Sequence, residues 1–422
     1  MKNTDYFRNK KVTIVGLARS GLACANLLYD LGAQVCVTDN QDNDSTRTNF
    51  AKLKSKNIKT ELGKHSLPFI ENRDLVVVSP GVNNTSQPIV WAEQFHIPII
   101  SEIEVAAILC PALVIAVTGS NGKTTVTTLI QMVLEAAGFR AFVCGNIGNP
   151  FCGELDKMLS GDFVSLELSS FQLERIQTFK PKISVILNIS PNHLDRYNSM
   201  QEYLAAKKRI FMNQDNTDYL VLNSSDPALK RLTTETKAKI VYFSETEDLN
   251  PNFAAVLSVS SILNIDKELA LNVLRNFKGI EHRLEQVAEI NNIIFVNDSK
   301  STTVDSTAWA LKSILRPIVL IAGGRHKGID YRLILDLARQ KVKEVILIGE
   351  AKAKIADAFG GLLSIDEAGT LEEAVHKAFR KASPGDCVLL SPMCSSFDMF
   401  SDYEERGIVF KKAVYDLAAV KS

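Results

Sequence analysis

The stretch 112-ALVIAVTGSNGKTT-125 decides how the fold of this chain is interpreted. Its first part, Ala112–Val117, is a continuous apolar run that predicts a buried strand. The loop Thr118–Thr125 follows, and the pattern after it predicts an amphipathic helix over Thr124–Ala137. A glycine-rich loop between a strand and a helix is the setting of a phosphate-binding loop, whose backbone N–H groups and helix N-terminus attract phosphate oxygens. The stretch therefore indicates an α/β domain that binds a nucleotide.

Within this loop each residue type has a chemical task. The ammonium group of Lys123 would neutralise the β- and γ-phosphates, and the hydroxyl of Thr124 would hold Mg²⁺. Val117 stands where the longer consensus loop has its first glycine, so this is a shorter variant, and a chance surface turn is the alternative. The loop residues predicted to bind ATP are Gly119, Ser120, Asn121, Gly122, Lys123, Thr124 and Thr125.

Two polar groups follow further predicted strands of this domain. Glu167 lies near the end of the strand Phe163–Leu168, where a carboxylate beside a phosphate loop can bind the Mg²⁺ of the nucleotide. A capping or solvated glutamate is the alternative. His193 follows the strand Ile183–Leu187, at the edge where open parallel sheets bind ligands, and this predicts a metal or phosphate ligand.

The first hundred residues carry a weaker nucleotide signal. A turn at Gly16–Gly21 follows the predicted strand Lys11–Val15, and Asp39 ends the next strand. Ala18 replaces the second glycine of the dinucleotide fingerprint, which disfavours NAD. We expect a nucleotide diphosphate in another pose, with its base or sugar near Asp39 or Thr38. A purely structural tight turn is the alternative.

The last third of the chain repeats the pattern of strands that end in polar loops. Asn297–Thr302, Gly323–Lys327 and Ser391–Phe397 each follow a predicted strand. Because the carboxyl ends of parallel strands meet at one edge, the three loops predict one continuous binding face.

Length and composition set the wider limits. A chain of 422 residues suggests several domains, predicted at 1–108, 109–279 and 280–422. Lys+Arg and Asp+Glu both number 48, so the net charge gives no basic block for nucleic acid. No apolar run reaches the roughly 18 residues of a membrane span, and seven scattered cysteines suit a reducing compartment. We therefore expect a cytoplasmic protein without membrane insertion.

Taken together, the motifs resemble the Mur ligase family of peptidoglycan synthesis, most closely its D-glutamate-adding branch. The resemblance covers nearly the whole chain. It rests on Gly16–Gly21, Ser79–Gly81, Thr118–Thr125, Gly145–Gly148, Glu167–Leu173, Asn192–Arg196, Ala205–Lys207, His282-Arg283, Asn297–Thr302, Ser391–Asp398 and Tyr403–Gly407. It implies a three-domain α/β fold: a Rossmann-like N-terminal domain that binds a UDP substrate, a central P-loop ATPase domain with a parallel sheet, and a C-terminal Rossmann-like domain that binds an amino acid.

The resemblance also implies roles for individual residues. Catalysis would involve Lys123, Glu167, His193 and Lys207, and metal would bind to Thr124, Glu167, His193 and Lys207. ATP would also meet Asn252, Arg283 and Asp298. The two other substrates would meet Gly16, Ser20, Thr38, Asp39, Ser79, Gly81, Asn146, His193, Lys300, Thr302, Lys327, Ser396, Phe397 and Tyr403.

The implied reaction activates the carboxylate of UDP-N-acetylmuramoyl-L-alanine as an acyl phosphate, which the amino group of D-glutamate then attacks. The implied cofactors are ATP, two Mg²⁺ ions and a CO₂-derived carbamate on Lys207, and the implied state is a monomer. From the residues alone, Lys207 is a solvated lysine of a long helix predicted over Met200–Met212.

Three other classes of protein were weighed against this interpretation. A nicotinamide dehydrogenase leaves the phosphate loop unexplained, and a regulatory P-loop switch leaves the loops of the third domain unexplained. Folylpolyglutamate synthetase lacks the first nucleotide-binding unit.

Overall fold

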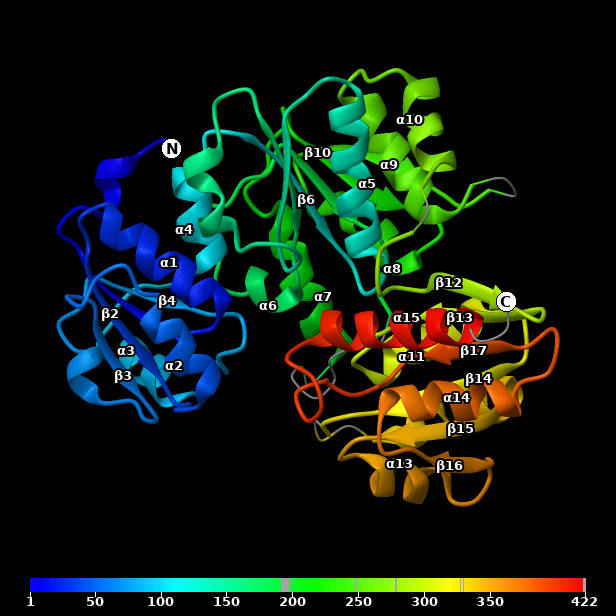
Figure 1. Cartoon of the computed structure of the whole chain (residues 1–422). Coiled ribbons are helices and arrows are strands. Elements are labelled where there is room, and N and C mark those ends of the chain that lie inside the picture. Colours follow the sequence, from blue (N-terminus) through cyan, green and yellow to red (C-terminus); the bar gives the residue numbers. More distant parts are fainter. Residues whose placement is uncertain are drawn as a thin grey trace. The chain divides into compact units, whose positions relative to one another are not determined.

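The computed structural model describes residues 1–190, 197, 199–246, 249–277, 279–326, 328 and 330–419. It divides into two compact units, Met1–Phe277 and Lys278–Ser422, each of which is described by itself. The first unit contains two sheets and the second contains one (Figure 1). This confirms the predicted α/β class with parallel sheets, while the domain boundaries after residues 108 and 279 stay predictions.

The first sheet is parallel throughout, with the order β3-β2-β1-β4-β5. Its strands are β1 (Lys11–Val15), β2 (Gln34–Asp39), β3 (Lys59–Leu62), β4 (Leu75–Val78) and β5 (Ile99–Ser101). Its helices are η1 (Thr4–Phe7), α1 (Arg19–Asp30), α2 (Asp44–Ala51), η2 (Leu67–Phe69), α3 (Gln87–Gln94) and α4 (Glu102–Leu109). Since β1 pairs with both β2 and β4, the strand order reverses there, and such a point opens a crevice at the carboxyl ends of the two strands.

The second sheet is also parallel, with the order β11-β10-β9-β6-β8-β7. Its strands are β6 (Leu113–Thr118), β7 (Ala141–Gly145), β8 (Phe163–Glu167), β9 (Ile183–Ile186), β10 (Tyr219–Asn223) and β11 (Lys239–Phe243). Its α-helices are α5 (Lys123–Ala136), α6 (Ser170–Leu173), α7 (Met200–Lys208), α8 (Pro227–Lys230), α9 (Pro251–Ile262) and α10 (Lys267–Arg275). Its 3₁₀ turns are η3 (Phe151–Gly153), η4 (Leu155–Lys157), η5 (Arg209–Phe211) and η6 (Arg231–Thr234). Strand β6 lies between β8 and β9, so the loops after these three strands are neighbours.

One apolar core runs through the first unit. It joins α1 and α4, which cover the first sheet, to the face of the second sheet that η3 covers. The other face of the second sheet packs against α5, α9 and α10, and α3 packs on the other face of the first. All seven cysteines are buried and none forms a disulfide, as expected for core thiols.

The third sheet has the order β12-β13-β17-β14-β15-β16 and is parallel except for the pair β12 and β13. Its strands are β12 (Glu285–Ile290), β13 (Ile293–Asn297), β14 (Ile318–Gly323), β15 (Val342–Ile348), β16 (Ile365–Glu367) and β17 (Cys387–Leu390). Helices α14 (Leu371–Lys381) and α15 (Tyr403–Ala419) pack on one face. The other face carries α11 (Val304–Ser313), η7 (Tyr331–Ile334), α12 (Leu335–Lys341) and α13 (Lys352–Phe359).

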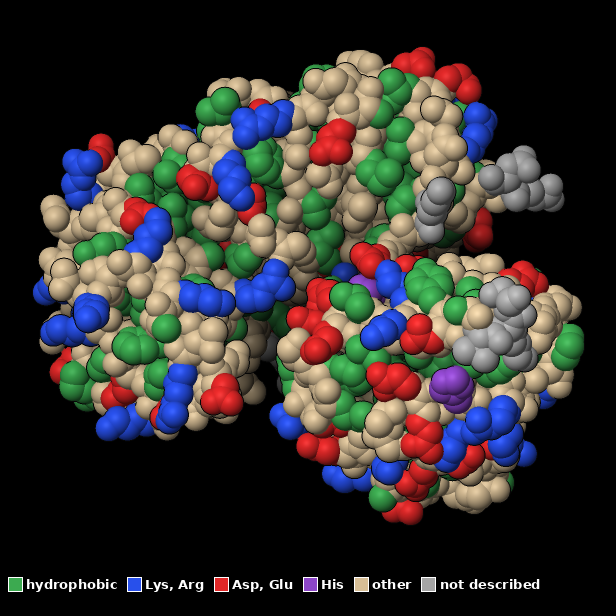
Figure 2. Space-filling view, in the orientation of Figure 1, with side chains coloured by type: hydrophobic (Ala, Val, Ile, Leu, Met, Phe, Trp, Pro, Cys, Tyr) green, Lys and Arg blue, Asp and Glu red, His purple; other side chains and the backbone are tan. Residues whose placement is uncertain are grey.

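The sequence-based expectations for one helix, for the surface charge and for membrane spans can be compared with the structure. The helix expected over Met200–Met212 is confirmed for Met200–Lys208, where α7 ends, and it is wrong beyond Lys208, where the chain tightens into the 3₁₀ turn η5. On the face shown in Figure 2, basic and acidic side chains are interspersed, in keeping with the balanced composition. No helix in the described part of the chain has the length and apolar character to cross a membrane.

Candidate functional site

The phosphate loop lies between β6 and α5, as predicted. Gly119 and Gly122 have φ angles of +151° and +83°, which a residue with a side chain rarely adopts. A Cβ on Gly122 would lie 2.4 Å from Oδ1 of Asn252, so the predicted ATP ligand on α9 sits against this loop. The glycines therefore give a backbone shape that no other residue could supply.

Hydrogen bonds attach the loop to the segment after β9. Ser120 N–H donates to the Asn188 carbonyl at 3.0 Å, and Asn121 N–H donates to the Asn188 side chain at 2.9 Å. Ser190 N–H donates to Oγ of Ser120 at 2.9 Å. These bonds orient the loop before any ligand arrives. The segment leads toward His193, which lies outside the described residues.

Lys123 and Thr124 occupy the first turn of α5. The Lys123 ammonium donates to the carbonyls of Gly119 and Ser120, at 2.9 Å each, so it lies over the loop. Thr124 is buried and Thr125 is partly buried. A cation at the N-terminus of a 14-residue helix matches the electrostatics of a bound phosphate.

Glu167, the last residue of β8, has the arrangement expected of a metal ligand. It is 1% exposed. Its Oε1 accepts from the Asn146 side chain at 2.7 Å, while its buried Oε2 has no hydrogen-bond partner among the described residues. An anionic oxygen kept dry and unpaired suits Mg²⁺, which prefers oxygen ligands. The described residues contain no group of three His, Cys, Asp or Glu that could hold a metal ion, and the predicted ligand His193 lies outside them.

Lys207 is the least expected member of this cluster. It is 1% exposed, and its Nζ donates to the Gly119 carbonyl at 2.9 Å and to Oγ1 of Thr118 at 3.3 Å. Burial, and secondly the charge of Lys123, lower the pKa of Lys207 well below its usual range, which Glu167 only partly opposes. Tertiary packing thus replaces the solvated lysine of the sequence-based alternative with a buried amine at the phosphate loop.

A second site opens at the carboxyl ends of β1 and β4. A cavity of about 520 Å³ lies there, and it is lined by the predicted residues Gly16, Ser20, Asp39, Ser79 and Gly81 and by Val15, Ala18, Arg19, Asn40, His65, Pro80, Val82, Asn83 and Ser86. Thr38, which was also predicted, is buried beside the cavity, with its hydroxyl 2.8 Å from Nδ1 of His65. The volume suits a ligand of nucleotide size.

Asp39 has a structural task in this cavity. Its two oxygens accept from the N–H groups of Leu17 and Gln41, at 2.6 and 2.8 Å. It therefore holds the loop after β1 against the loop after β2, so any contact with a base or sugar would use the remaining lone pairs.

The turn after β1 depends on Gly21, which leads to a first prediction. A Cβ on Gly21 would clash with the Gly16 carbonyl oxygen, at 1.9 Å. The same oxygen accepts a hydrogen bond from Oγ of Ser79 at 2.9 Å. We expect Gly21→Ala to raise KM for the nucleotide-linked substrate about tenfold or more, and to leave KM for ATP unchanged. Gly153→Ala is the control, because its Cβ would meet nothing closer than 3.6 Å. Equal KM values in both variants would contradict the prediction.

The two sites of the first unit are connected. The guanidinium of Arg19, on the rim of the cavity, donates to the Gly148 carbonyl. Asn146, two residues earlier, donates to Glu167. A substrate that fills the cavity and extends along Gly145–Gly148 would therefore arrive at Glu167, which is paired with Val117 just before the phosphate loop. The role of Asn146 in binding that substrate stays a prediction.

In the second unit, Arg283 and Asp298 lie close together. Arg283 stands between His282 and Leu284, whose φ angles of +62° and +44° mark a strained turn. Leu284 N–H donates to Asp298 at 3.2 Å, and Ser391 Oγ donates to its other oxygen at 2.8 Å. Burial raises the pKa of Asp298 to about 6, with the charge of Arg283 opposing.

The three predicted loops of this unit do share one edge. Met393 N–H donates to the Ser301 carbonyl at 3.0 Å, and Arg325 N–H to the Ser395 carbonyl at 2.9 Å. The ammonium of Lys300 lies 5.6 Å from the centre of the Tyr403 ring. Thr302 is partly buried, Ser396 is buried and Phe397 is 61% exposed. Lys327 lies outside the described residues.

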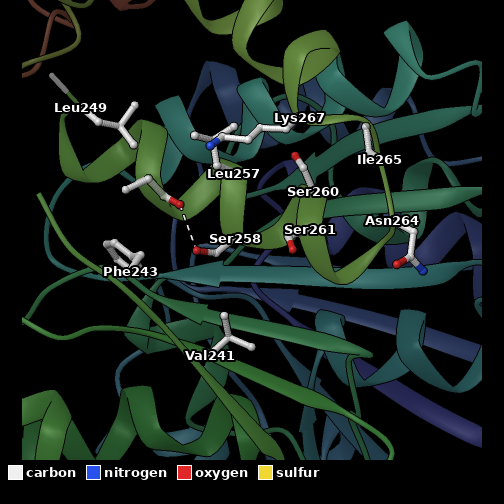
Figure 3. A pocket seen from close by; sticks show the side chains of 11 residues that line it. Val241, Phe243, Leu249, Leu257, Ser258, Ser260, Ser261, Asn264, Ile265 and Lys267 are labelled. Carbon is white, nitrogen blue, oxygen red and sulfur yellow. Dashed lines mark hydrogen bonds between the residues drawn. The ribbon is translucent and has the colours of Figure 1, made fainter. Parts of the chain in front are cut away.

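A cavity of about 670 Å³ is a different feature (Figure 3). It lies between β11, α9 and α10 and is mostly apolar. The hydroxyls of Ser258 and Ser260 donate to carbonyls of their own helix, at 3.1 and 2.9 Å. No residue of the predicted motifs lines it, so it is not the candidate site.

Sequence reasoning missed several residues of these sites. His65 and Asn40 line the first cavity, and Asn188 and Tyr203 contact the phosphate loop through Ser120 and Asn121. Asn188 lies in the loop after β9. The rule that selected His193, that polar residues after a parallel strand bind ligands, could therefore have found Asn188 as well. His65 follows an edge strand and carried no such signal.

Three family models match successive parts of the chain. "Mur ligase MurD-like, N-terminal domain" matches residues 10–101, "Mur ligase middle domain" matches 117–292, and "Mur ligase, glutamate ligase domain" matches 282–394. The three matches follow the order of the three sheets.

Similar proteins cover nearly the whole chain. UDP-N-acetylmuramoylalanine--D-glutamate ligase of Geotalea uraniireducens is 42% identical over 443 residues, which span 97% of this chain and 98% of the relative. The protein of the same name from Thermoanaerobacter pseudethanolicus is 39% identical and spans 97% and 99%. The crystal structure of UDP-N-acetylmuramate-alanine ligase MurC from Thermotoga maritima is similar in fold, with a TM-score of 0.60, 20% identity, and coverage of 96% and 99%.

Proposed function

This chain belongs to the Mur ligase family, and on that premise we propose that it is an ATP-dependent acid–amino-acid ligase that adds D-glutamate to UDP-N-acetylmuramoyl-L-alanine in peptidoglycan precursor synthesis. The observation that carries the proposal is the convergence of Lys123, Glu167 and Lys207 on one phosphate loop. The nucleotide-sized cavity, connected to that loop through Arg19 and Asn146, supports it.

The first step joins two anions. An oxygen of the substrate carboxylate attacks the γ-phosphorus of ATP, the bond to the ADP oxygen breaks, and an acyl phosphate forms. Lys123 and the N-terminus of α5 would stabilise the charge on the transferring phosphoryl group, since this chemistry depends on positioning and electrostatics. Mg²⁺, held by Thr124 and Glu167 with His193, would supply further positive charge between the anions.

In the second step the amino nitrogen of D-glutamate attacks the acyl carbon. A tetrahedral intermediate forms, the carbon–oxygen bond to phosphate breaks, and the nitrogen loses a proton. This step requires no nucleophilic side chain. Lys300, Thr302, Ser396, Tyr403 and Lys327 are the residues proposed to surround the amino acid, together with Phe397.

We include a carbamate on Lys207 in the proposal. Carbamate formation joins the neutral amine nitrogen to the carbon of CO₂ and releases a proton. The burial of Lys207 and its lowered pKa favour that neutral form. The product carries one negative charge shared by two oxygens, which are ligands of the kind that Mg²⁺ prefers, whereas an ammonium group would repel the ion. We further propose that the protein acts as a monomer in the cytoplasm.

A panel of acceptors tests the proposed function. Purified protein with ATP, Mg²⁺ and UDP-N-acetylmuramoyl-L-alanine should release phosphate with D-glutamate, and about a hundredfold more slowly with L-glutamate, L-alanine or a diamino acid, because buried polar groups reject a ligand that leaves them unpaired. Faster ligation of another amino acid would identify a sister Mur ligase. Phosphate release without any amine would favour a nucleotide switch.

A further inference from the structure

Arg406 is an unusual residue for the interior of a protein. It lies in the first turn of α15, has 0% exposure, and is the largest fully buried side chain of the described chain. Arginine is rarely buried completely unless it is paired. Among the described residues, no ion pair within 4.0 Å includes Arg406, and the nearby acidic groups are Asp398 and the Cys394 thiol.

The guanidinium instead bonds to the loops that follow two strands. Its Nε donates to Oγ of Ser299 at 2.9 Å, and its Nη2 donates to the Ser299 carbonyl at 2.8 Å. Its Nη1 donates to the Cys394 carbonyl at 3.2 Å. Ser299 lies after β13 and Cys394 after β17, so one planar side chain fixes the spacing of two loops.

The third loop of the same edge also passes close to this group. A Cβ on Gly324, after β14, would lie 3.3 Å from Nη1 of Arg406 and 2.3 Å from the Ser395 carbonyl. Only a glycine, here at φ +132°, lets the β14 loop approach so closely. Arg406 thus bonds to two of the three loops that the sequence assigned to one binding face, and the third passes so close that a side chain at Gly324 would meet its Nη1.

The charge of Arg406 is retained in this setting. Burial lowers its pKa to about 10, so the group is protonated at neutral pH. Asp398 is the facing carboxylate: its Oδ2 accepts from Glu350 N–H at 2.9 Å, and its buried Oδ1 has no partner among the described residues. A buried cation without a direct carboxylate partner costs stability, and an apolar side chain of similar size would often serve the fold better.

We propose that Arg406 is a positioning residue for the acceptor amino acid. It holds Ser299, which lies between Asp298 and Lys300, at a fixed distance from the Cys394–Ser396 segment and from Gly324. Its positive charge, beneath these loops, adds to the attraction of a dicarboxylate. This inference rests on the proposed function, because it concerns the amino acid that the same loops would bind.

Two substitutions test the inference. Arg406→Lys keeps the charge but loses the planar fork, and Arg406→Met removes both. We expect KM for D-glutamate to rise about tenfold in Arg406→Lys and about a hundredfold in Arg406→Met. KM for ATP and for the UDP substrate should stay within about twofold of wild type. Hydroxylamine, a small nucleophile that needs no amino-acid site, should still convert the acyl phosphate into a hydroxamate in both variants.

The matched control is Arg316→Met. Arg316 also donates to a loop carbonyl of the second unit, that of Asn292 at 3.2 Å, but at the opposite end of the sheet. The Arg316→Met substitution should at most lower the melting temperature, and it should leave KM for D-glutamate unchanged. Melting curves of all variants show whether they are folded.

Several outcomes would overturn the inference. An unchanged KM for D-glutamate in Arg406→Lys does so whether or not Arg406→Met folds, because the fork is then unnecessary. Equal losses for all three substrates would make Arg406 merely structural. If the wild-type protein does not use D-glutamate, the proposed function fails instead, and this is visible before any variant is made.

Discussion

Replacing Lys207 by alanine is expected to abolish ligation while the protein stays folded. The buried amine donates to the phosphate loop through Gly119 and Thr118, and its lowered pKa favours the neutral form that reacts with CO₂. If the proposed carbamate helps to hold Mg²⁺, its loss removes positive charge from between the two reacting anions, and the rate should fall by about 1,000-fold or more. Phosphate release measures the rate, and the melting temperature measures folding.

The neighbouring residue gives a matched control. Lys208 lies on the same helix, is partly exposed and pairs with Glu235 at the surface, so Lys208→Ala should keep nearly full activity. Short carboxylates such as acetate should restore part of the activity of Lys207→Ala, because they bring carboxylate oxygens into the space that the removed side chain occupied. ¹³CO₂ labelling should give a carbamate signal in wild type that Lys207→Ala lacks. Full activity in Lys207→Ala, or no such signal in wild type, would contradict the idea.

Glu167→Gln should have a comparable effect through the metal. The amide keeps the shape and can still accept from Asn146, but it replaces the unpaired anionic Oε2 by a neutral group. We expect kcat/KM to fall by about 1,000-fold, which corresponds to about 4 kcal/mol of transition-state stabilisation. The Mg²⁺ concentration that gives half of the maximal rate should rise at least about tenfold, since a neutral oxygen binds the ion less tightly.

Asp218→Asn controls for the loss of a buried carboxylate. Asp218 is 3% exposed and precedes β10 at the amino end of the same sheet, where it pairs with Lys182 at 3.4 Å. The Asp218→Asn substitution should lower the free energy of unfolding, but it should not change the Mg²⁺ concentration that gives half of the maximal rate. If Glu167→Gln shows the Mg²⁺ dependence of wild type, Glu167 is not a metal ligand and Oε2 needs another explanation.

The central strands and helices were predictable because their patterns are strong. The strand Lys11–Val15 was expected with the bounds that the structure has, and the expected strands Ala112–Val117, Phe163–Leu168 and Ile183–Leu187 lie within one residue of theirs. Each is an apolar run between turn signals, as in a strand covered on both faces. The edge strand β3 was missed, since its half-exposed sequence Lys-Thr-Glu-Leu contains no apolar run.

The phosphate loop and the order of its neighbours followed from sequence for a local reason. A loop whose glycines need positive φ, placed between a strand and a helix, is specified by adjacent residues. The rule that parallel strands present their carboxyl ends at one edge then placed Glu167 and the loops of the last third without coordinates.

What only the tertiary structure decided are the contacts between residues far apart in the chain. Sequence by itself made Lys207 a solvated lysine and gave no role to Arg406 or His65. The fold buries Lys207 against Gly119, 88 residues away, and Arg406 against Ser299, 107 residues away. Burial changes the protonation and partners of a charged group far more than its neighbours in sequence do, because desolvation depends on everything packed around it. The chain therefore determines its phosphate loop locally, whereas the chemistry of the buried charged groups around its binding loops is a property of the folded protein.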